Sequence, residues 1–346
     1  MKASFKKHRL NFKRPGGTSR GILKTKDSWI LCLEENSHRG YGECSIIEGL
    51  SWDDPNRIES VVLEVCEALS LAKPLPDLTD FPAVQMGLET ALLSLNSPTV
   101  WDLFPSAFSR GETSIPINGL VWMGTIDFMQ EQIDDLLNRG FDCIKLKIGA
   151  LHFEEEFQLL KSLRKRYSLS SLILRVDANG AFHSKEALGK LEQLATLGIH
   201  SIEQPIATGQ WEEMAKLCNK SPIPIALDEE LIGCQQAAKR KQMLEAIHPH
   251  YLILKPSLLG GFSHADAWID LAEELQIGWW ATSALESNIG LNAIAQWAYT
   301  KKLSIPQGLG TGSLFTNNFE SPLVIKKDCL WIDNSISWTQ NLTDVC

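Results

Sequence analysis

From residue 115 onward the sequence alternates short apolar runs with amphipathic stretches, and this alternation limits the folds that the chain can adopt. An apolar run, a helical pattern and another apolar run are typical of parallel strands joined by crossover helices. The apolar runs are 115–123, 143–148, 172–176, 199–202, 224–227, 251–254 and 277–282, and the helical patterns between them include 128–138, 154–167, 184–197 and 263–275.

The number of these units favours a closed barrel. Seven or eight strand–helix units in about 200 residues fit a barrel better than an open sheet. An open doubly wound sheet stays an alternative at this point, although the glycine-rich phosphate signature that usually follows its first strand is missing.

The first part of the chain has a different order of elements. Strand-like runs (29–34 and 40–44) come first and helical patterns (55–71 and 82–95) follow, which favours a separate α+β domain. A strand-like run at 323–326 in the tail is expected to return to this domain. We therefore expect an α+β domain at 1–112, joined by the tail at 312–346, and a barrel domain at 113–311.

Charged residues stand at the ends of five successive predicted strands. They are Lys145, Lys147, Asp177, Glu203, Asp228 and Lys255, with Arg175 inside the second of these strands. Lys145 and Lys147 face the same side because strand residues two apart do so. The steps from 147 to 177, 203, 228 and 255 are 30, 26, 25 and 27 residues, about one strand–helix unit each. The carboxyl ends of barrel strands form one face, so these charges are expected at one mouth.

The three acids at this mouth indicate a divalent cation. A single charged residue at a strand end is usually solvated or caps the next helix, but six in register are hard to obtain in that way. Three ionised carboxylates about 4 Å apart repel by roughly 4 kcal/mol per pair at an intermediate dielectric. A cation removes this repulsion, and an all-oxygen ligand set favours magnesium over zinc.

Lysines beside such a cation suit one kind of reaction. A lysine near a cation and a second lysine has a lowered pKa and can serve as a general base. A proton next to a carboxylate is weakly acidic because its loss leaves a dianionic enediolate, which a divalent ion stabilises. The residues therefore predict metal-dependent proton abstraction beside a carboxylate.

Charge and composition exclude other partners. A net charge of −9 and a pI near 5.5 argue against nucleic acid and anionic membranes. No run of 18 apolar residues appears, and the basic N-terminus has no apolar stretch behind it, so neither a membrane helix nor a secretory signal is expected. The eight cysteines lack CxxC spacing and are expected as free thiols in the cytoplasm. The sequence leaves open whether the chain forms a homo-oligomer.

The Lys-x-Lys motif, the acid order Asp, Glu, Asp and the later lysine resemble the enolase superfamily, and within it the muconate-lactonising subgroup. The resemblance covers almost the whole chain. It implies an α+β capping domain, a (β/α)7β TIM-like barrel and a C-terminal tail that rejoins the cap. It also implies that Asp177, Glu203 and Asp228 bind Mg²⁺, for which Mn²⁺ could substitute.

The same resemblance assigns roles to the remaining site residues. Lys147 would be the base, Lys255 would lie across the substrate from it, and Lys145 would steer the substrate carboxylate. The expected substrate contacts are Asn179, Arg175, Ser283, Gly308, Thr18 and Arg20. Glu229 is expected either to contact the substrate or to support residues that do.

Three segments resemble the o-succinylbenzoate synthase family more narrowly: 15–21, 115–120 and 283–291. That family dehydrates 2-succinyl-6-hydroxy-2,4-cyclohexadiene-1-carboxylate to 2-succinylbenzoate in menaquinone biosynthesis. The resemblance implies a syn elimination in which one lysine takes the α-proton and then protonates the departing hydroxyl. Cap loops at 16–20 and 46–50 would close over the site, and backbone amides near Gly308 would bind the succinyl carboxylate.

Other activities of the same scaffold are alternatives, namely N-acylamino acid racemase, dipeptide epimerase and muconate cycloisomerase. Dipeptide epimerases carry an Asp-x-Asp motif near the eighth strand that holds the substrate's ammonium group. Residues 307–313 contain no acid, which favours a small dicarboxylate over a dipeptide. A barrel that has lost catalysis is disfavoured because all six charges are present.

Overall fold

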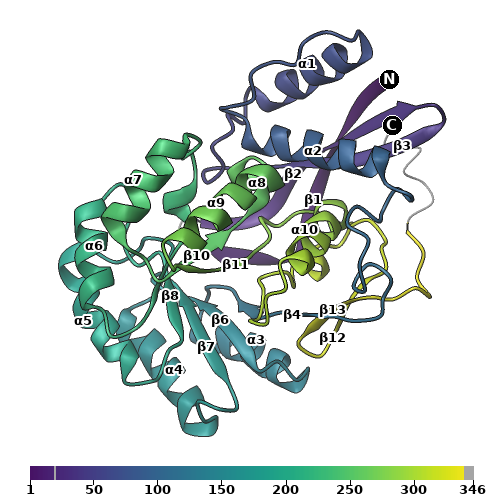
Figure 1. Cartoon of the computed structure of the whole chain (residues 1–346). Coiled ribbons are helices and arrows are strands. Elements are labelled where there is room, and N and C mark those ends of the chain that lie inside the picture. The colour runs from purple at the N-terminus through teal and green to yellow at the C-terminus, as the bar shows by residue number, and fades with distance from the viewer. Residues whose placement is uncertain (19–20, 339–346) are drawn as a thin grey trace.

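The computed structural model describes residues 1–18 and 21–338 and shows a small cap on a barrel (Figure 1). The cap sheet is antiparallel, in the order β1 (Lys2–Thr18), β2 (Gly21–Glu35), β3 (His38–Ser45). Two helices cover it, α1 (Ile58–Ser70) and α2 (Pro82–Asn96). The predicted contact at Arg20 lies outside the described residues, and so does the side chain of Thr18.

Helix α2 packs closely on β3 because glycines leave room for its backbone. A Cβ added to Gly42 would stand 1.8 Å from the carbonyl oxygen of Gly87 in α2. The helix begins at Pro82, whose missing N–H costs nothing in a first turn, and Asp53 Oδ1 accepts a hydrogen bond from Ala83 N at 3.1 Å. The cap therefore has its own apolar core between this sheet and the two helices.

Seven parallel strands form the barrel wall in sequence order, and helices cover their outer side (Figure 1). The strands are β5 (Gly119–Val121), β6 (Cys143–Lys147), β7 (Ile173–Asp177), β8 (Ser201–Glu203), β9 (Ile225–Leu227), β10 (Tyr251–Leu254) and β11 (Gly278–Ala281). The helices are α3 (Ile126–Asn138), α4 (Phe153–Arg166), α5 (Ser184–Ala195), α6 (Trp211–Lys220), α7 (Ala237–Ile247), α8 (Pro256–Leu259), α9 (Phe262–Glu274) and α10 (Asn288–Thr300). The alternation in the sequence thus predicts the observed elements.

Two residues close the barrel between β11 and the segment that precedes β5. Gln307 forms a parallel bridge with Ile117, and Gly308 forms one with Thr282. Gln307 N donates to Pro116 O at 2.8 Å, and Gly308 N donates to Ala281 O at 2.8 Å. The eighth strand is therefore only this pair, and the predicted (β/α)7β barrel with an α+β cap is confirmed.

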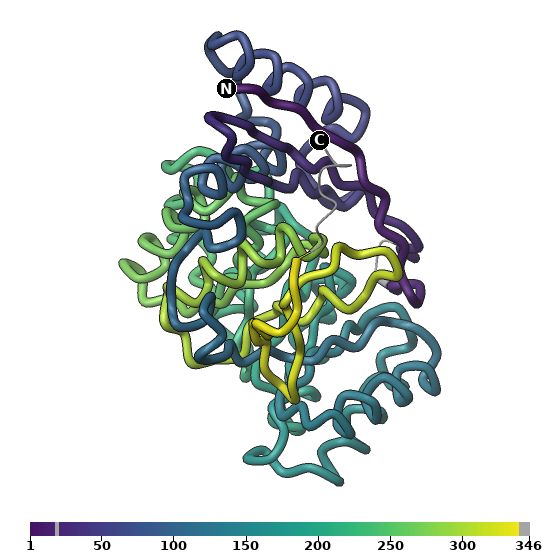
Figure 2. Tube along the Cα trace, turned by 90° about the vertical axis from the view of Figure 1, so that its right-hand side faces the viewer, coloured from purple at the N-terminus to yellow at the C-terminus, as the bar shows by residue number. Residues whose placement is uncertain are grey.

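The tail is held mainly by the barrel. Its hairpin, β12 (Leu323–Lys326) and β13 (Cys329–Ile332), pairs with β4 (Ile115–Pro116), so the predicted strand at 323–326 joins the start of the barrel domain and not the cap sheet. The cap contact comes earlier, where Phe315 bridges Phe12 and Thr316 N donates to Asn11 O at 2.9 Å (Figure 2). The exact domain boundaries stay a prediction.

The described residues also bear on the expectations about membrane helices and cysteines. None of its helices is both long and apolar enough to cross a bilayer. Its cysteines carry free thiols, and six of the seven are buried.

The close contact at Gly42 gives a first prediction. Gly42→Ala should destabilise the fold by about 1–3 kcal/mol, because its Cβ cannot coexist with the present position of α2. Gly189→Ala is the matched control, since a Cβ there meets nothing within 4 Å and the change favours helix α5 by roughly 0.5–1 kcal/mol. Urea unfolding followed by circular dichroism measures both, and equal stabilities would contradict the packing described for α2.

Candidate active site

Strand register brings the predicted charges together at the carboxyl ends of the barrel strands. Lys147 pairs with Asp177 across β6 and β7, and Asp177 pairs with Glu203 across β7 and β8. Asp228 and Lys255 directly follow β9 and β10. All of them have little contact with solvent. Because these strands are parallel and in register, neighbouring carboxyl ends place their side chains at one mouth.

The two lysines of β6 bind the carboxylates on one side of this mouth. Lys145 Nζ lies 2.7 Å from Glu203 Oε2 and 3.1 Å from Asp177 Oδ2. Lys147 Nζ lies 3.0 Å from Asp177 Oδ2 and donates to Asn179 Oδ1 at 2.8 Å. Leu146 points outward into the core between strands and helices, as the alternation of a strand requires.

Lys255 approaches the same acids from the other side. Its ammonium group forms an ion pair with Asp228 Oδ2 and lies 3.8 Å from Glu203 Oε1. Lys147 and Lys255 therefore border the acid row at its two ends, one beside Asp177 and one beside Asp228. The family resemblance implies that these two lysines lie on opposite sides of a substrate, and that role stays a prediction.

The burial of three acids in one row shapes their electrostatics. Burial, together with the negative charges of Asp177 and Asp228, raises the pKa of Glu203 to about 8. Burial also acts to raise the pKa of Asp177, but the charges of Lys147, Lys145 and Lys255 lower it well below its ordinary value. Ionisation of Glu203 therefore costs free energy even with Lys145 and Lys255 beside it.

The acids in turn raise the pKa values of two of the lysines. Burial acts to lower the pKa of Lys145, but Glu203 and Asp177 raise it above its ordinary value. The pKa of Lys255 is raised against burial in the same way, by Asp228 and Glu203. The sequence argument expects lysine pKa values to fall beside a cation, and these raised values arise where acids alone face the lysines.

The acids fit a hard divalent cation by their chemistry. Asp177, Glu203 and Asp228 offer only oxygen donors, and Glu203 Oε1 is buried without a hydrogen-bond partner among the described residues. As the side chains stand, lysine ammonium groups lie between the carboxylates, and the described residues contain no group of three acids, histidines or cysteines close enough to hold a metal. Binding would require a cation to replace part of these lysine contacts.

Asn179 and Glu229 extend the site away from the acids. Asn179 N donates to Asp177 Oδ1 at 3.0 Å, and Asn179 Nδ2 donates to Glu229 Oε1 at 2.9 Å. Asn179 has a left-handed backbone with φ +45°, a conformation that asparagine tolerates better than most residues. This turn places its amide oxygen on Lys147 and its amide nitrogen on Glu229.

The predicted contact Arg175 lies deeper than the sequence suggests. It points into the barrel one layer below Asp177, is 1% exposed and does not line the cavity. Its Nη1 donates to Pro306 O at 2.8 Å, and its guanidinium stacks over Trp280 at 4.1 Å. In this position Arg175 ties β7 to the closing strand, and contact with a substrate would require the cavity to deepen.

A cavity of about 230 Å³ lies between the charges and the cap. Cap residues Ile22, Leu23, Ile47, Glu48 and Leu50 line one side, and barrel residues Trp122, Lys145, Lys147, Asn179, Asp228, Glu229, Lys255, Ser283, Leu285 and Gly308 are among those on the other. Ser283 and Gly308 border this cavity, and their contact with a substrate stays a prediction. Ser283 Oγ lies 2.5 Å from Thr311 Oγ1, so the two hydroxyls form a hydrogen bond between neighbouring loops of the barrel.

Several cavity residues were not predicted. Trp122 follows β5 at the barrel mouth, with Lys147 Nζ 5.9 Å from its ring centroid. Its place at the end of the first apolar run was a signal that could have identified it, because the same rule found the charged strand ends. Leu285 and Thr311 stand on loops and gave no comparable signal.

Comparisons with known proteins agree with this architecture. Residues 128–334 match the family model described as enolase C-terminal domain-like. The chain is 47% identical to an o-succinylbenzoate synthase of Desulfotalea psychrophila, over 94% of this chain and 97% of that protein. A crystal structure of MenC from Desulfotalea psychrophila superimposes with a TM-score of 0.86 and 44% identity, over 96% of this chain and 99% of that one. An N-succinylamino acid racemase of Amycolatopsis is 27% identical, over 84% of this chain and 81% of that protein.

The acid row gives a second prediction, which does not depend on catalysis. Mg²⁺ at about a hundred times its dissociation constant should stabilise the folded chain by about 2.7 kcal/mol, because only the folded state gathers the acids. Glu203→Gln should lose most of this gain in a thermal-shift measurement. Glu156→Gln is the control, since Glu156 is equally buried but accepts hydrogen bonds from Gly149 N and Leu151 N away from the acids. An unchanged Mg²⁺ effect in Glu203→Gln would contradict the assignment.

Proposed function

The chain belongs to the enolase C-terminal domain-like family, and we propose that it is an o-succinylbenzoate synthase, a carbon–oxygen lyase of menaquinone biosynthesis. The reaction is the dehydration of 2-succinyl-6-hydroxy-2,4-cyclohexadiene-1-carboxylate to 2-succinylbenzoate. The observation that carries this proposal is 47% identity to an o-succinylbenzoate synthase along almost the full length of both chains. A cavity of about 230 Å³ suits a small-molecule substrate, and we propose that the enzyme works in the cytoplasm.

Lys147 is the proposed base. Its amine takes the proton from the carbon beside the ring carboxylate, and the electron pair of that C–H bond moves into the carboxylate to form an enediolate. The pair then returns, the C–O bond on the neighbouring ring carbon breaks, and the ammonium of Lys147 gives its proton to the departing hydroxyl, which leaves as water. One residue can serve both steps because a syn elimination presents both groups on one face.

Lys255 and Lys145 keep their charge in this proposal. Lys255 lies at the Asp228 end of the acid row, where its ammonium can stabilise the enediolate from the face opposite Lys147. Lys145 is held by Glu203 and Asp177, so it can orient the carboxylate without giving up its proton. A divalent cation held by Asp177, Glu203 and Asp228 would supply further positive charge at the substrate carboxylate, where negative charge develops.

The cap supplies the apolar side of the cavity. Ile22, Leu23, Ile47 and Leu50 face the barrel mouth, and Trp122 adds an aromatic wall beside Lys147. Exclusion of water strengthens each electrostatic interaction with the enediolate. The cap-facing cavity can take a flat six-membered ring, and aromatisation of the product drives the elimination.

The closing strand supports a dicarboxylate over an amine-bearing substrate. The segment around Gly308 contains no acid that could pair with an ammonium group, and Gly308 itself borders the cavity. A Cβ at Gly308 would meet Thr282 Oγ1 at 2.5 Å, so the backbone there is closely packed. We propose that backbone amides in this stretch bind the succinyl carboxylate.

An N-acylamino acid racemase is the second candidate, because lysines at both ends of the acid row could exchange a proton from either face. Incubation with an N-succinylamino acid in deuterated water distinguishes the two. Deuterium at the α-carbon with inversion, together with no aromatic product from the cyclohexadiene, would favour the racemase and remove the synthase.

A third prediction tests the base. Lys147→Ala should lower kcat for formation of the aromatic product by roughly 10²–10⁴-fold, since a positioned general base contributes about that much. An ultraviolet assay with Mg²⁺, repeated with a chelator, measures it, and circular dichroism checks the fold. Lys241→Ala, at a half-exposed lysine on α7, should keep full activity. Retained activity in Lys147→Ala would contradict the mechanism, and a blank assay with the unaltered chain would contradict the function.

A further inference from the structure

A second group of buried charges lies directly behind Lys255. Glu286 is fully buried, and its Oε1 accepts a hydrogen bond from Ser257 Oγ at 2.6 Å. Ser257 is also fully buried and stands two residues after Lys255 in the chain. The carboxylate of Glu286 does not border the cavity, although Ser283, Ala284 and Leu285 before it do. A buried carboxylate in the loop after β11 thus binds the first turn of α8, which follows β10.

The backbone between Ser257 and Lys255 is short and regular. Leu258 N donates to Lys255 O at 2.8 Å, so the first turn of α8 starts at the carbonyl of Lys255. Gly261 N in turn donates to Pro256 O at 2.9 Å, which ends that turn. Any shift of Ser257 therefore moves the backbone from which the Lys255 side chain extends.

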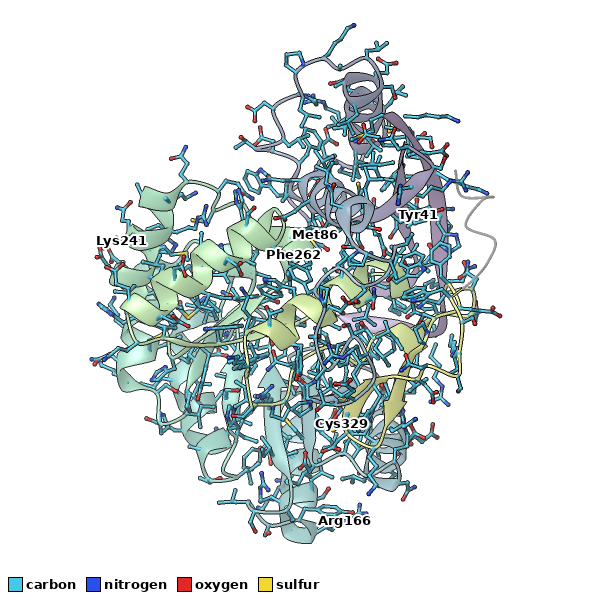
Figure 3. All side chains as sticks on the ribbon, turned by 45° about the vertical axis from the view of Figure 1, so that its right-hand side comes forward. Tyr41, Met86, Arg166, Lys241, Phe262 and Cys329 are labelled. Atoms are coloured by element: carbon cyan, nitrogen blue, oxygen red, sulfur yellow. The ribbon has the colours of Figure 1, made fainter. Side chains whose placement is uncertain are left out.

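The other end of the same segment is held by the cap. Glu89 of α2 accepts hydrogen bonds from Phe262 N at 2.5 Å and Ser263 N at 3.1 Å, at the start of α9. Gly261 has φ +97°, and a Cβ there would stand 2.0 Å from Glu89 Oε2. Met86 of α2 and Phe262 belong to one buried cluster and lie together at this junction (Figure 3). Two carboxylates therefore hold the residues from Ser257 to Ser263.

A buried lysine of the cap also influences Glu286. Lys26 of β2 is buried, and its ammonium contacts Ser45 Oγ of β3. Burial raises the pKa of Glu286, and the positive charge of Lys26 acts to lower it. Glu286 Oε2 has no hydrogen-bond partner among the described residues. One oxygen of this buried carboxylate thus accepts the Ser257 hydroxyl, and the other accepts no hydrogen bond from the described residues.

We propose that Glu286 is a positioning residue that, through Ser257, fixes the backbone of Lys255 and holds its ammonium at the Asp228 end of the acid row. The kinetic consequence rests on the proposed function, because it assigns Lys255 to enediolate stabilisation. The structural consequence, a fixed segment after β10, does not depend on that function.

A buried hydrogen bond could also contribute to folding alone, and the chain offers a matched control. Ser28 of β2 is fully buried as well, and its Oγ donates to Glu43 Oε1 at 2.7 Å. Glu43 also accepts from Ser287 N and Gly290 N, both at 2.9 Å, so it holds the start of α10 and makes no hydrogen bond or ion pair with Lys255 among the described residues. Ser28→Ala and Ser257→Ala each remove a buried hydroxyl that donates to a buried glutamate.

The first experiment compares steady-state kinetics and thermal stability of these two variants with Mg²⁺ present. Ser257→Ala should lower kcat roughly tenfold with KM changed less than about twofold, because a small misplacement of a charge costs transition-state stabilisation. Ser28→Ala should lower the thermal midpoint to a similar extent and keep kcat. Glu286→Gln, which retains an oxygen for the Ser257 hydroxyl, should keep kcat within about threefold. Equal kcat values in Ser28→Ala and Ser257→Ala would overturn the proposal.

The second experiment separates this inference from the proposed function. Amide hydrogen exchange over residues 255–261 should be faster in Ser257→Ala than in the unaltered chain, and unchanged there in Ser28→Ala. If the unaltered chain forms no aromatic product but this difference in exchange is seen, the function fails while the positioning stands. If Ser257→Ala does not fold, Glu286→Gln is measured in the same way, and full protection of 255–261 together with loss of kcat would overturn the proposal.

Discussion

The burial of three carboxylates at adjacent strand ends is the constraint on which the rest of this structure depends. Asp177 and Glu203 are paired by register, and Asp228 ends the next strand, so the fold itself forces them together. Such a row is stable only with positive charge around it, and the two sides of the row receive it from Lys145, Lys147 and Lys255. The same all-oxygen row offers the ligands that a hard divalent cation prefers.

Much of the barrel could be predicted because its periodicities are local. Alternation two residues apart put Lys145 and Lys147 inside, and the unit length put the acids on successive strands. The closing strand could not be found in this way, since Gln307 and Gly308 form no apolar run and their pairing depends on the other strands being closed already. The tail strand was recognised, but its partner β4 was not, because pairing between distant segments leaves no local pattern.

The polar residues behind the mouth show a second limit of sequence reasoning. Arg175 alternates correctly to face inward, yet depth within a barrel follows from the neighbouring layers, here Trp280 and the carbonyl of Pro306. Glu286 stands in a motif beside the site, but its carboxylate points away from the cavity because a loop has no fixed alternation. The direction of a loop side chain depends on which buried partners the packed domains bring to it.

Cap and barrel meet through charge as well as through apolar contact. Glu43 and Glu89 of the cap accept hydrogen bonds from the first backbone amides of α10 and α9, where helix dipoles favour negative charge. Helix α10 follows the loop that carries Leu285, and α9 follows α8, which begins directly after Lys255. The cap therefore does more than cover the cavity, because the backbone that carries these groups is fixed partly by residues outside the barrel. An L-Ala-D/L-Glu epimerase of Bacillus subtilis shares this fold at 20% identity, so the fold by itself does not determine which reaction a chain performs.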